Sequence, residues 1–255
     1  MARMAPAGYG NRVEGIHSVA AAAQRGRIRK LWVEEGRLGR SEIAEIVGVV
    51  GSEKTALVRD VRPMAESEAP QGVVADCAPI MSAPIDELGV PEAAVVVLDH
   101  IEDPHNVGAI ARSALASGMT GMVVSSRRAA PLSATAFKAA AGALETLPVA
   151  VVGSIPEALS RLKDGGVWIV GLEAGSATSL LGLGLLTEPV AVVVGAEGMG
   201  LRVLSAKRCD VLVSIPMAAN FESLNASVSA ALACFEIMRV RAESDPSLQS
   251  DLPPG

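Results

Sequence analysis

Asn106, Gly108 and Arg112 form the first of three clusters in this sequence whose residue types could do chemistry. The cluster follows an apolar run at 93–98 and leads into an alanine-rich stretch that we expect to be helical. An arginine in such a helix needs an anion or a partner, because a buried guanidinium without one is costly. Asp103 or Asn106 could instead simply cap the helix. The two polar side chains do not share one helix face, but they can meet if Asn106 precedes the helix.

The second cluster is a glycine-rich segment, 195–200, that follows the apolar run 189–194 and contains Glu197. Its spacing is G-x-x-G-x-G, whereas dinucleotide-binding loops need G-x-G-x-x-G. No acidic residue ends the next apolar run to hold a ribose, so a nicotinamide-dependent enzyme is disfavoured. The glycines are equally consistent with a tight turn between a strand and a helix. Glu197 could be structural, because a helix N-terminus favours a carboxylate, or it could serve a reaction.

The third cluster extends from Ile215-Pro216-Met217 to a polar stretch that ends at Ser227. Ser223 could cap a long amphipathic helix expected at 223–241. Asn225 and Ser227 would then lie in its first turn, where both residue types are poor helix formers. Their presence is unexplained if they are only helix residues.

Each cluster follows one of the short apolar runs that mostly alternate with helical patterns. This alternation indicates a parallel β-sheet with helices on both faces, and ligands bind such sheets at the carboxyl ends of the strands. The clusters are therefore expected to lie together. The expected strands are 93–98, 122–124, 148–152, 167–170, 189–194 and 211–215, and the expected helices are 107–117, 134–144, 155–163, 201–207 and 223–241.

The first 75 residues form a smaller α/β pattern. After an arm of about 12 residues we expect a helix at 14–24, a strand at 30–33, a helix with Ser41 as its N-cap, and strands at 55–61 and 73–75. The expected organisation is a small domain at 1–75, a proline-rich linker at 76–91, a larger domain at 92–243 and a disordered tail at 244–255.

The charge of the chain is unevenly distributed. The total is −6, yet residues 1–75 hold 11 basic and 9 acidic side chains, a sum of +2, which leaves −8 for the remainder. Four of these cations lie within six residues: Arg25, Arg27, Arg29 and Lys30. They could belong to a solvated junction between a helix and a strand, or they could contact a phosphate backbone.

Composition excludes several classes of protein. Half of the residues are apolar, which is ample for a core and excludes a disordered chain. The longest stretches without a charged residue have 14 residues, whereas a membrane-spanning helix needs about 20. Cys77, Cys209 and Cys234 are far apart with no histidine at ligand spacing, so we expect buried thiols in a reducing compartment and no metal site. We find no targeting segment and expect a cytoplasmic protein.

Taken together, the three clusters resemble the three motifs of the SpoU (TrmH) family, the RNA ribose 2′-O-methyltransferases of the SPOUT superfamily. The resemblance covers about residues 92–241 in the order and spacing of the family. The chain is similar to the bacterial 23S rRNA guanosine 2′-O-methyltransferases in particular. Its residues 14–19 and the arginine-rich stretch at 25–30 look like the L30e-like RNA-binding domain of those enzymes. The resemblance implies a trefoil-knotted SPOUT domain, a homodimer formed through it, and S-adenosylmethionine as the methyl donor.

The resemblance also assigns residues by motif position. Those expected to hold the donor are Gly195, Ile215 and Leu224 through backbone groups, with Glu197 and Met217. Those expected at the reacting centre are Arg112, Asn106, Glu197, Ser223 and Asn225. RNA is expected to contact Arg25, Arg27, Arg29, Lys30 and Arg112. The family usually has glycine where Ala219 stands, which can alter the third-motif loop.

The chemistry leaves two roles open for Arg112. The family's arginine at this position has been proposed as the base for the ribose hydroxyl, yet a guanidinium normally stays protonated. It can equally clamp a phosphate and stabilise the developing alkoxide.

Besides a 23S rRNA enzyme, the sequence is compatible with a tRNA 2′-O-methyltransferase, an antibiotic-resistance rRNA methyltransferase or a non-catalytic RNA-binding assembly protein.

Overall fold

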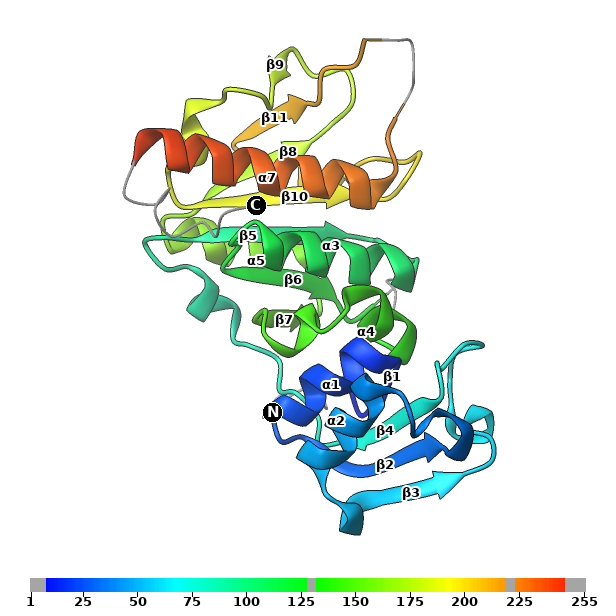
Figure 1. Ribbon diagram of the computed structural model, residues 1–255. Coiled ribbons are helices and arrows are strands. Elements are labelled where there is room, and N and C mark those ends of the chain that lie inside the picture. Colours follow the sequence, from blue (N-terminus) through cyan, green and yellow to red (C-terminus); the bar gives the residue numbers. More distant parts are fainter. Residues whose placement is uncertain (1–7, 128–131, 219–222, 246–255) are drawn as a thin grey trace. The chain divides into compact units, whose positions relative to one another are not determined.

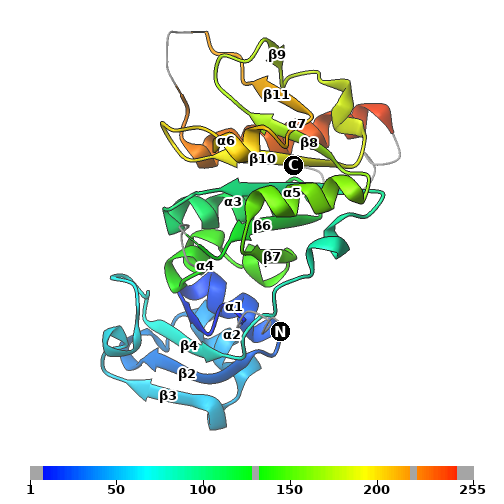
Figure 2. The ribbon, with the colours of Figure 1, turned by 180° about the vertical axis from the view of Figure 1, so that it is seen from behind.

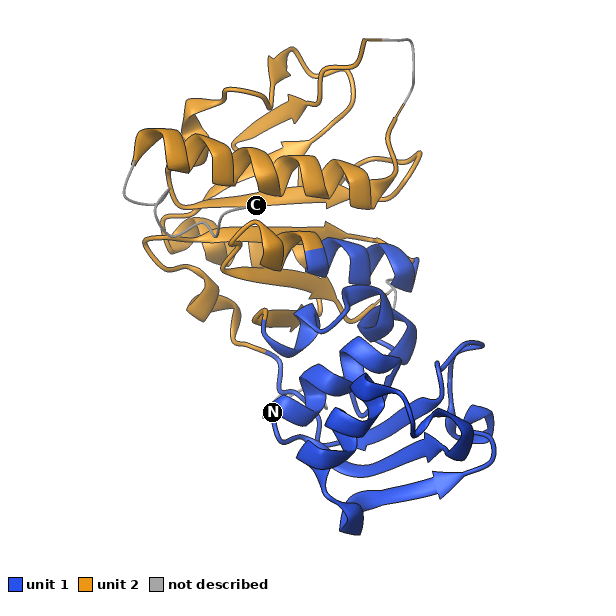
Figure 3. Cartoon of the chain, viewed as in Figure 1, with its two compact units in different colours: residues 1–82, 103–112, 130–146 blue, residues 83–102, 113–129, 147–255 orange. Residues whose placement is uncertain are grey.

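The computed structural model describes residues 8–127, 132–218 and 223–245 of the chain (Figure 1). They form two compact units (Figure 3). The first contains residues 1–82, 103–112 and 130–146, and the second contains residues 83–102, 113–129 and 147–255. The small domain expected at 1–75 is therefore extended by two segments from the later sequence, and its last strand runs to Cys77.

The first unit contains a four-stranded sheet in the order β1-β4-β2-β3. Strands β1 and β2 are antiparallel to β4, and β3 is parallel to β2. Buried apolar residues alternate with more exposed ones along β2, which indicates that one face of the sheet is packed. The elements are β1 (Arg12–Glu14), α1 (Ile16–Gln24), β2 (Ile28–Glu34), α2 (Ser41–Val50), β3 (Thr55–Val58), β4 (Val73–Cys77) and α4 (Ala134–Ala140).

The second unit is built on a seven-stranded parallel sheet in the order β7-β6-β5-β10-β8-β11-β9, as expected for the larger domain. Its central strands are buried on both faces, with α7 over one and α5 over the other (Figures 1 and 2). The strands are β5 (Ala94–Asp99), β6 (Gly121–Ser125), β7 (Val149–Val152), β8 (Trp168–Leu172), β9 (Thr178–Ser179), β10 (Val190–Gly195) and β11 (Val211–Ser214). The helices are α5 (Ile155–Asp164), α6 (Val203–Ala206) and α7 (Ala226–Ser244), and α3 (Pro104–Ala116) runs from the first unit into the second.

Strand β11 takes an unusual place in this sheet. The chain passes from β8 to β9 and then to β10, on the other side of β8, before β11 pairs between β8 and β9. The end of the chain thus inserts a strand between two that are consecutive in sequence. The expected strands at 93–98 through 211–215 are all present, and β9 is the one that the apolar pattern missed.

Several expected helix boundaries are wrong. Helix α3 begins at Pro104, because proline is favoured in a first turn, so Asn106 lies inside the helix. Ser41 is the first residue of α2 and does not cap it, and Asn225, not Ser223, caps α7. The arm expected before residue 14 contains β1, which is paired with β4. Ala219 and most of the tail at 244–255 lie outside the described residues.

Short 3-10 helices fill several of the connections: η1 (Glu35–Arg37), η2 (Ser52–Lys54), η3 (Arg62–Met64), η4 (Ile85–Leu88), η5 (Ala143–Glu145) and η6 (Gly184–Thr187). None of the helices in the described part of the chain combines the length and apolar character that crossing a membrane requires.

Candidate active site

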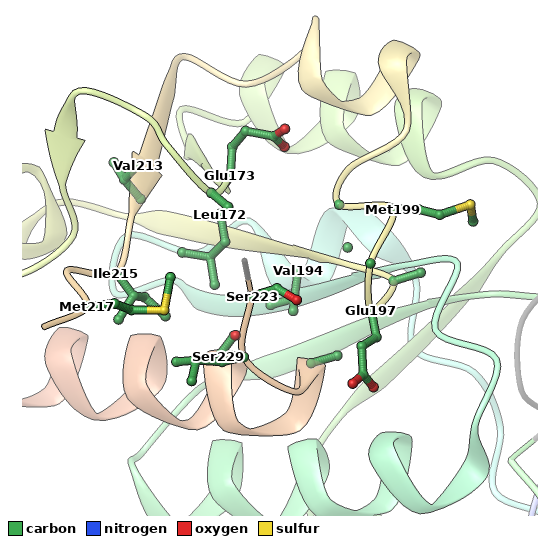
Figure 4. A pocket seen from close by; sticks show the side chains of 17 residues that line it. Leu172, Glu173, Val194, Glu197, Met199, Val213, Ile215, Met217, Ser223 and Ser229 are labelled. Carbon is green, nitrogen blue, oxygen red and sulfur yellow. The ribbon is translucent and has the colours of Figure 1, made fainter. Parts of the chain in front are cut away.

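An open pocket of about 250 Å³ lies in the second unit, where β8, β10 and β11 end and α7 begins (Figure 4). The second and third motifs supply most of its wall, so the parallel sheet does bring these two clusters together as expected. The residues that line it are Leu172, Glu173, Ala174, Val194, Gly195, Ala196, Glu197, Gly198, Met199, Gly200, Val213, Ile215, Met217, Ser223, Leu224, Ala226 and Ser229.

The glycines of the second motif are required by the backbone. The loop after β10 folds back so that Ala196 and Gly200 form a β-bridge. A Cβ atom at Gly195 would lie 2.2 Å from the carbonyl carbon of Gly200, and Gly198 and Gly200 have positive φ values of 74° and 63°. The turn expected from the glycine spacing is present, and the same turn forms one wall of the pocket.

Asp99 anchors this loop, a role that the sequence analysis did not find. Its side chain is fully buried at the end of β5. One carboxylate oxygen accepts a hydrogen bond from the backbone N–H of Arg202 at 2.8 Å, and the other lies 2.8 Å from Nδ1 of His100. His100 adopts a left-handed backbone with φ 63°. In the sequence Asp99 is simply the acid that follows the apolar run 93–98, and nothing there shows that it is buried.

Glu197 and Asn225 are in contact at the pocket. The Asn225 side-chain amide donates to Oε2 of Glu197 at 3.3 Å. Oδ1 of Asn225 accepts from the backbone N–H of Ser227 at 2.9 Å and from its hydroxyl at 2.6 Å, which caps α7. Asn225 is therefore both a helix cap and a partner of the carboxylate, and Ser227 supports it.

The predicted site residues fall into two groups. All five residues expected to hold the donor line the pocket, as do Glu197 and Ser223 of those expected at the reacting centre. Asn106 and Arg112 lie on α3 in the first unit, where Arg112 is exposed. The intervening Gly108 has a packing role, because a Cβ there would lie 2.3 Å from the carbonyl oxygen of Ala136 on α4.

Glu173, which sequence reasoning also missed, contributes a polar atom to the pocket. Its Oε2 is buried and has no hydrogen-bond partner within the described residues. A buried carboxylate oxygen in this state requires a donor, and a ligand that carries hydroxyl or amino groups can supply one. No pattern in the sequence distinguishes Glu173 from other acids at strand ends.

The four cations at residues 25–30 differ in their exposure to solvent. Arg25, Arg29 and Lys30 are exposed, and the ammonium of Lys30 lies 5.0 Å from the ring centroid of Trp32. Arg27 instead forms a two-pronged ion pair with Glu145, with N–O distances of 2.7 and 2.5 Å, and also donates to the carbonyl oxygens of Gly10 and Ala78.

The Arg27 pair is nearly closed to solvent, with the two side chains 12% and 1% exposed. Burial lowers the pKa of Arg27, but the hydrogen bond and the charge of Glu145 outweigh this effect, so that the pKa is raised. These four hydrogen bonds engage Arg27 within the fold, and we therefore expect a structural role for it in place of the predicted RNA contact.

Two family models match the chain. One is described as the SpoU rRNA methylase family and matches residues 93–235. The chain belongs to the SpoU rRNA methylase family. The other is described as RNA 2′-O ribose methyltransferase substrate binding and matches residues 12–82, which contain the four-stranded sheet of the first unit. The resemblance seen in the three motifs is thereby confirmed.

One relative matches this SpoU-family chain over most of its length, and another matches part of it. It is 36% identical over 241 residues to a protein of Staphylococcus haemolyticus named for the TrmH family of tRNA/rRNA methyltransferases, covering 90% of this chain and 95% of that one. It is 48% identical over 154 residues to an uncharacterized tRNA/rRNA methyltransferase of Synechocystis. That match covers 60% of this chain but only 40% of the relative.

Solved structures have the same fold. The SpoU methyltransferase AviRb of Streptomyces viridochromogenes, solved in complex with the cofactor AdoMet, matches with a TM-score of 0.77 and 25% identity, covering 91% of this chain and 90% of that one. A structure named RNA 2′-O ribose methyltransferase matches with a TM-score of 0.75 and 26% identity over 90% of this chain and 88% of that one.

Proposed function

We propose that this protein transfers a methyl group from S-adenosylmethionine to a ribose 2′-hydroxyl of 23S rRNA. The observation that carries the proposal is the pocket at which the second and third motif loops meet, with the Glu197–Asn225 pair beside it. The AdoMet complex of AviRb and the match to an RNA 2′-O ribose methyltransferase support the donor and the acceptor respectively.

The pocket fits a donor that combines apolar and polar groups. Leu172, Val194 and Ile215 offer apolar contacts, and Oε2 of Glu173, which has no partner among the residues that the structure describes, needs a hydrogen-bond donor. Backbone groups at Gly195, Ile215 and Leu224 lie in the wall, where they can bind the edges of a purine or a carboxylate. Met217 adds a further apolar side chain.

When bound, S-adenosylmethionine supplies an electrophilic methyl group on a sulfonium. The ribose oxygen forms the new bond to the methyl carbon, the carbon–sulfur bond breaks with its electron pair staying on sulfur, and the hydroxyl loses its proton. Glu197 accepts that proton, and Asn225 fixes the position of the carboxylate. Ser223 and Asn106 position the ribose by hydrogen bonds.

Arg112 binds the phosphate beside the target ribose in this proposal. Its guanidinium can hold a phosphate through two parallel hydrogen bonds and stabilise the developing alkoxide, whereas a guanidinium normally stays protonated and is therefore a poor base. RNA is further held by the first unit through the exposed Arg25, Arg29 and Lys30. This assignment is supported by the substrate-binding family model at residues 12–82.

The protein acts as a cytoplasmic homodimer with a trefoil knot in this proposal. The insertion of β11 between β8 and β9 supports the knot. An exposed apolar stripe on α7 supports the dimer, since Val228, Leu232 and Phe235 are 47%, 42% and 43% exposed. Helical spacing places the three side chains on one face, which a second copy can cover.

The test is methyl transfer to defined RNAs. The protein is incubated with radiolabelled S-adenosylmethionine and unmodified transcripts of 23S rRNA and tRNA, and products are mapped for 2′-O-methylation. We expect label at a ribose of 23S rRNA. Label on tRNA alone would show that the substrate is tRNA and not 23S rRNA. Label on a base would show that the enzyme methylates bases and not the ribose. Donor binding without any transfer would favour a non-catalytic RNA-binding protein.

A further inference from the structure

A ridge of exposed apolar and basic side chains follows the second motif. We define the α6 ridge as residues 199–208, the end of the glycine loop together with α6 and the turn after it. Met199, Val203 and Leu204 are 67%, 69% and 66% exposed, which makes them the three most exposed large apolar side chains in the described part of the chain. Such a concentration within six residues indicates a contact surface.

The same segment carries three cations. Arg202, Lys207 and Arg208 are all exposed, and none of them forms an ion pair with a residue that the structure describes. The cations are interleaved with the apolar side chains along the chain. The ridge therefore offers apolar contact and positive charge over the same short distance.

The ridge is continuous with the pocket and is held in place. Met199 lines the pocket, and Figure 4 shows its side chain extending along the edge of the loop. The buried Leu201 and the hydrogen bond from the Arg202 N–H to Asp99 fix the backbone between the loop and α6. These contacts fix the backbone at the start of α6 from within the protein, so binding does not have to order that part of the backbone.

We infer that the α6 ridge binds the RNA strand that carries the target ribose, an inference that rests on the proposed function. Bases next to the target pack on Met199, Val203 and Leu204, while phosphates face the three cations. Single-stranded RNA is the partner that offers flat apolar faces and regularly spaced negative charge together. A second copy of this chain fits less well, because a symmetric contact would set the cations of one ridge against those of the other.

The apolar part of the ridge is tested with Val203→Ser combined with Leu204→Ser. Both side chains are about two-thirds exposed, so folding should be unaffected. Binding of a fluorescent single-stranded RNA of about 12 nucleotides is measured by anisotropy, and we expect it to weaken about tenfold. The affinity for S-adenosylmethionine, measured by calorimetry, should not change. The control is Leu181→Ser, because Leu181 is 52% exposed in the same unit and does not line the pocket.

The basic part is tested with Lys207→Ala combined with Arg208→Ala. If two phosphate contacts are lost, the slope of log affinity against log salt concentration should become shallower by about 1.4. An unchanged RNA affinity in both double variants would overturn the inference. So would a change in sedimentation mass in the serine variant, because it would assign the ridge to contact between copies. RNA binding is read independently of turnover, so a wild-type protein that binds this RNA through the ridge but transfers no methyl group would contradict only the proposed function.

Discussion

The side-chain amide of Asn225 contacts Glu197 with one end and caps α7 with the other. The amide nitrogen lies 3.3 Å from Oε2 of Glu197, and the amide oxygen lies 2.9 Å from the backbone nitrogen of Ser227. The start of the last helix and a carboxylate of the second motif are therefore held by one residue. A change at Asn225 can disturb stability, catalysis or both, and two substitutions separate these effects.

Asn225→Asp should leave stability nearly unchanged and reduce methyl transfer. Aspartate caps helices as well as asparagine does, but it cannot donate to Glu197 and places a second negative charge beside it. Asn225→Ala should in addition lower the free energy of unfolding by about 1 kcal/mol, since the cap is lost. Urea unfolding and initial rates on 23S rRNA measure the two effects. Equal activity of wild type and Asn225→Asp would show that the contact with Glu197 has no part in the reaction.

Glu197→Gln should lower kcat by about a hundredfold or more, because the amide retains an acceptor for Asn225 but can neither take a proton nor balance a cation. The dissociation constant for S-adenosylmethionine should stay within about threefold, less than 1 kcal/mol. Glu157→Gln is the control, since Glu157 is an exposed acid in the first turn of α5. A variant that loses donor binding instead would assign Glu197 to the donor site.

Arg112→Ala should abolish turnover while S-adenosylmethionine affinity remains nearly intact. Arg112→Lys separates the two roles of the guanidinium. A clamp needs two parallel donors, so lysine should restore little activity at any pH. A base would instead favour lysine, whose lower pKa would make the rate rise towards pH of about 10. Single-turnover rates across this range decide between them, with Arg59→Ala, an exposed arginine of the same unit, as control.

Arg27 and Arg29 should respond in opposite ways, although they are two residues apart. Arg27→Ala leaves Glu145 buried without its partner and should lower the free energy of unfolding by about 3–5 kcal/mol. Arg29→Ala removes an exposed cation and should leave unfolding unchanged while weakening RNA binding. Urea titrations and RNA anisotropy on both variants test this. A stable Arg27→Ala protein with weakened RNA binding would return Arg27 to the RNA contacts.

The three thiols should be inert in the folded protein at neutral pH. Burial raises the pKa of Cys77, Cys209 and Cys234 to about 12 each. An unfolded thiol has a pKa of about 8.5, so between these values the unfolded chain releases protons that the folded chain keeps. Their stabilising contribution is fully present below pH of about 8.5, and the free energy of unfolding should fall as the pH rises above it. Urea midpoints at neutral and alkaline pH measure the change in stability, and iodoacetamide labelling measures the reactivity of the thiols. Rapid labelling of the native protein at neutral pH would contradict the prediction that the thiols are inert.

The sequence predicts the sheet well because its strands carry their own signal. Runs such as Val190–Gly195 are short and apolar throughout, as is typical of a strand buried on both faces of a sheet. Helix starts were harder, since Ser223 and Asn225 are both good caps and tertiary contact with Glu197 favours the second. Pro104 indicated where α3 begins, because proline is favoured in the first turn of a helix. The expected start at residue 107 followed the apolar periodicity instead.

The site was predictable where motifs are local and not where partners are distant in sequence. Gly195, Ile215 and Leu224 followed from the motif resemblance, and they line one pocket. The residues near Arg27 in the sequence do not predict its ion pair with Glu145, which is 118 residues away. Asp99 stabilises the glycine loop through a backbone group 103 residues later, which no sequence pattern encodes.

The position of β11 has a consequence for the biogenesis of the enzyme. A ribosome delivers the N-terminal strands first, so most of the parallel sheet can pair before Val211 is synthesised. The pocket also needs Ile215, Leu224 and the first turn of α7, which come from the last sixth of the chain. They follow β11, the strand that must enter between β8 and β9 after both have been made. An incomplete chain is thus a scaffold without this pocket, and an RNA that it meets early cannot be modified until synthesis is finished.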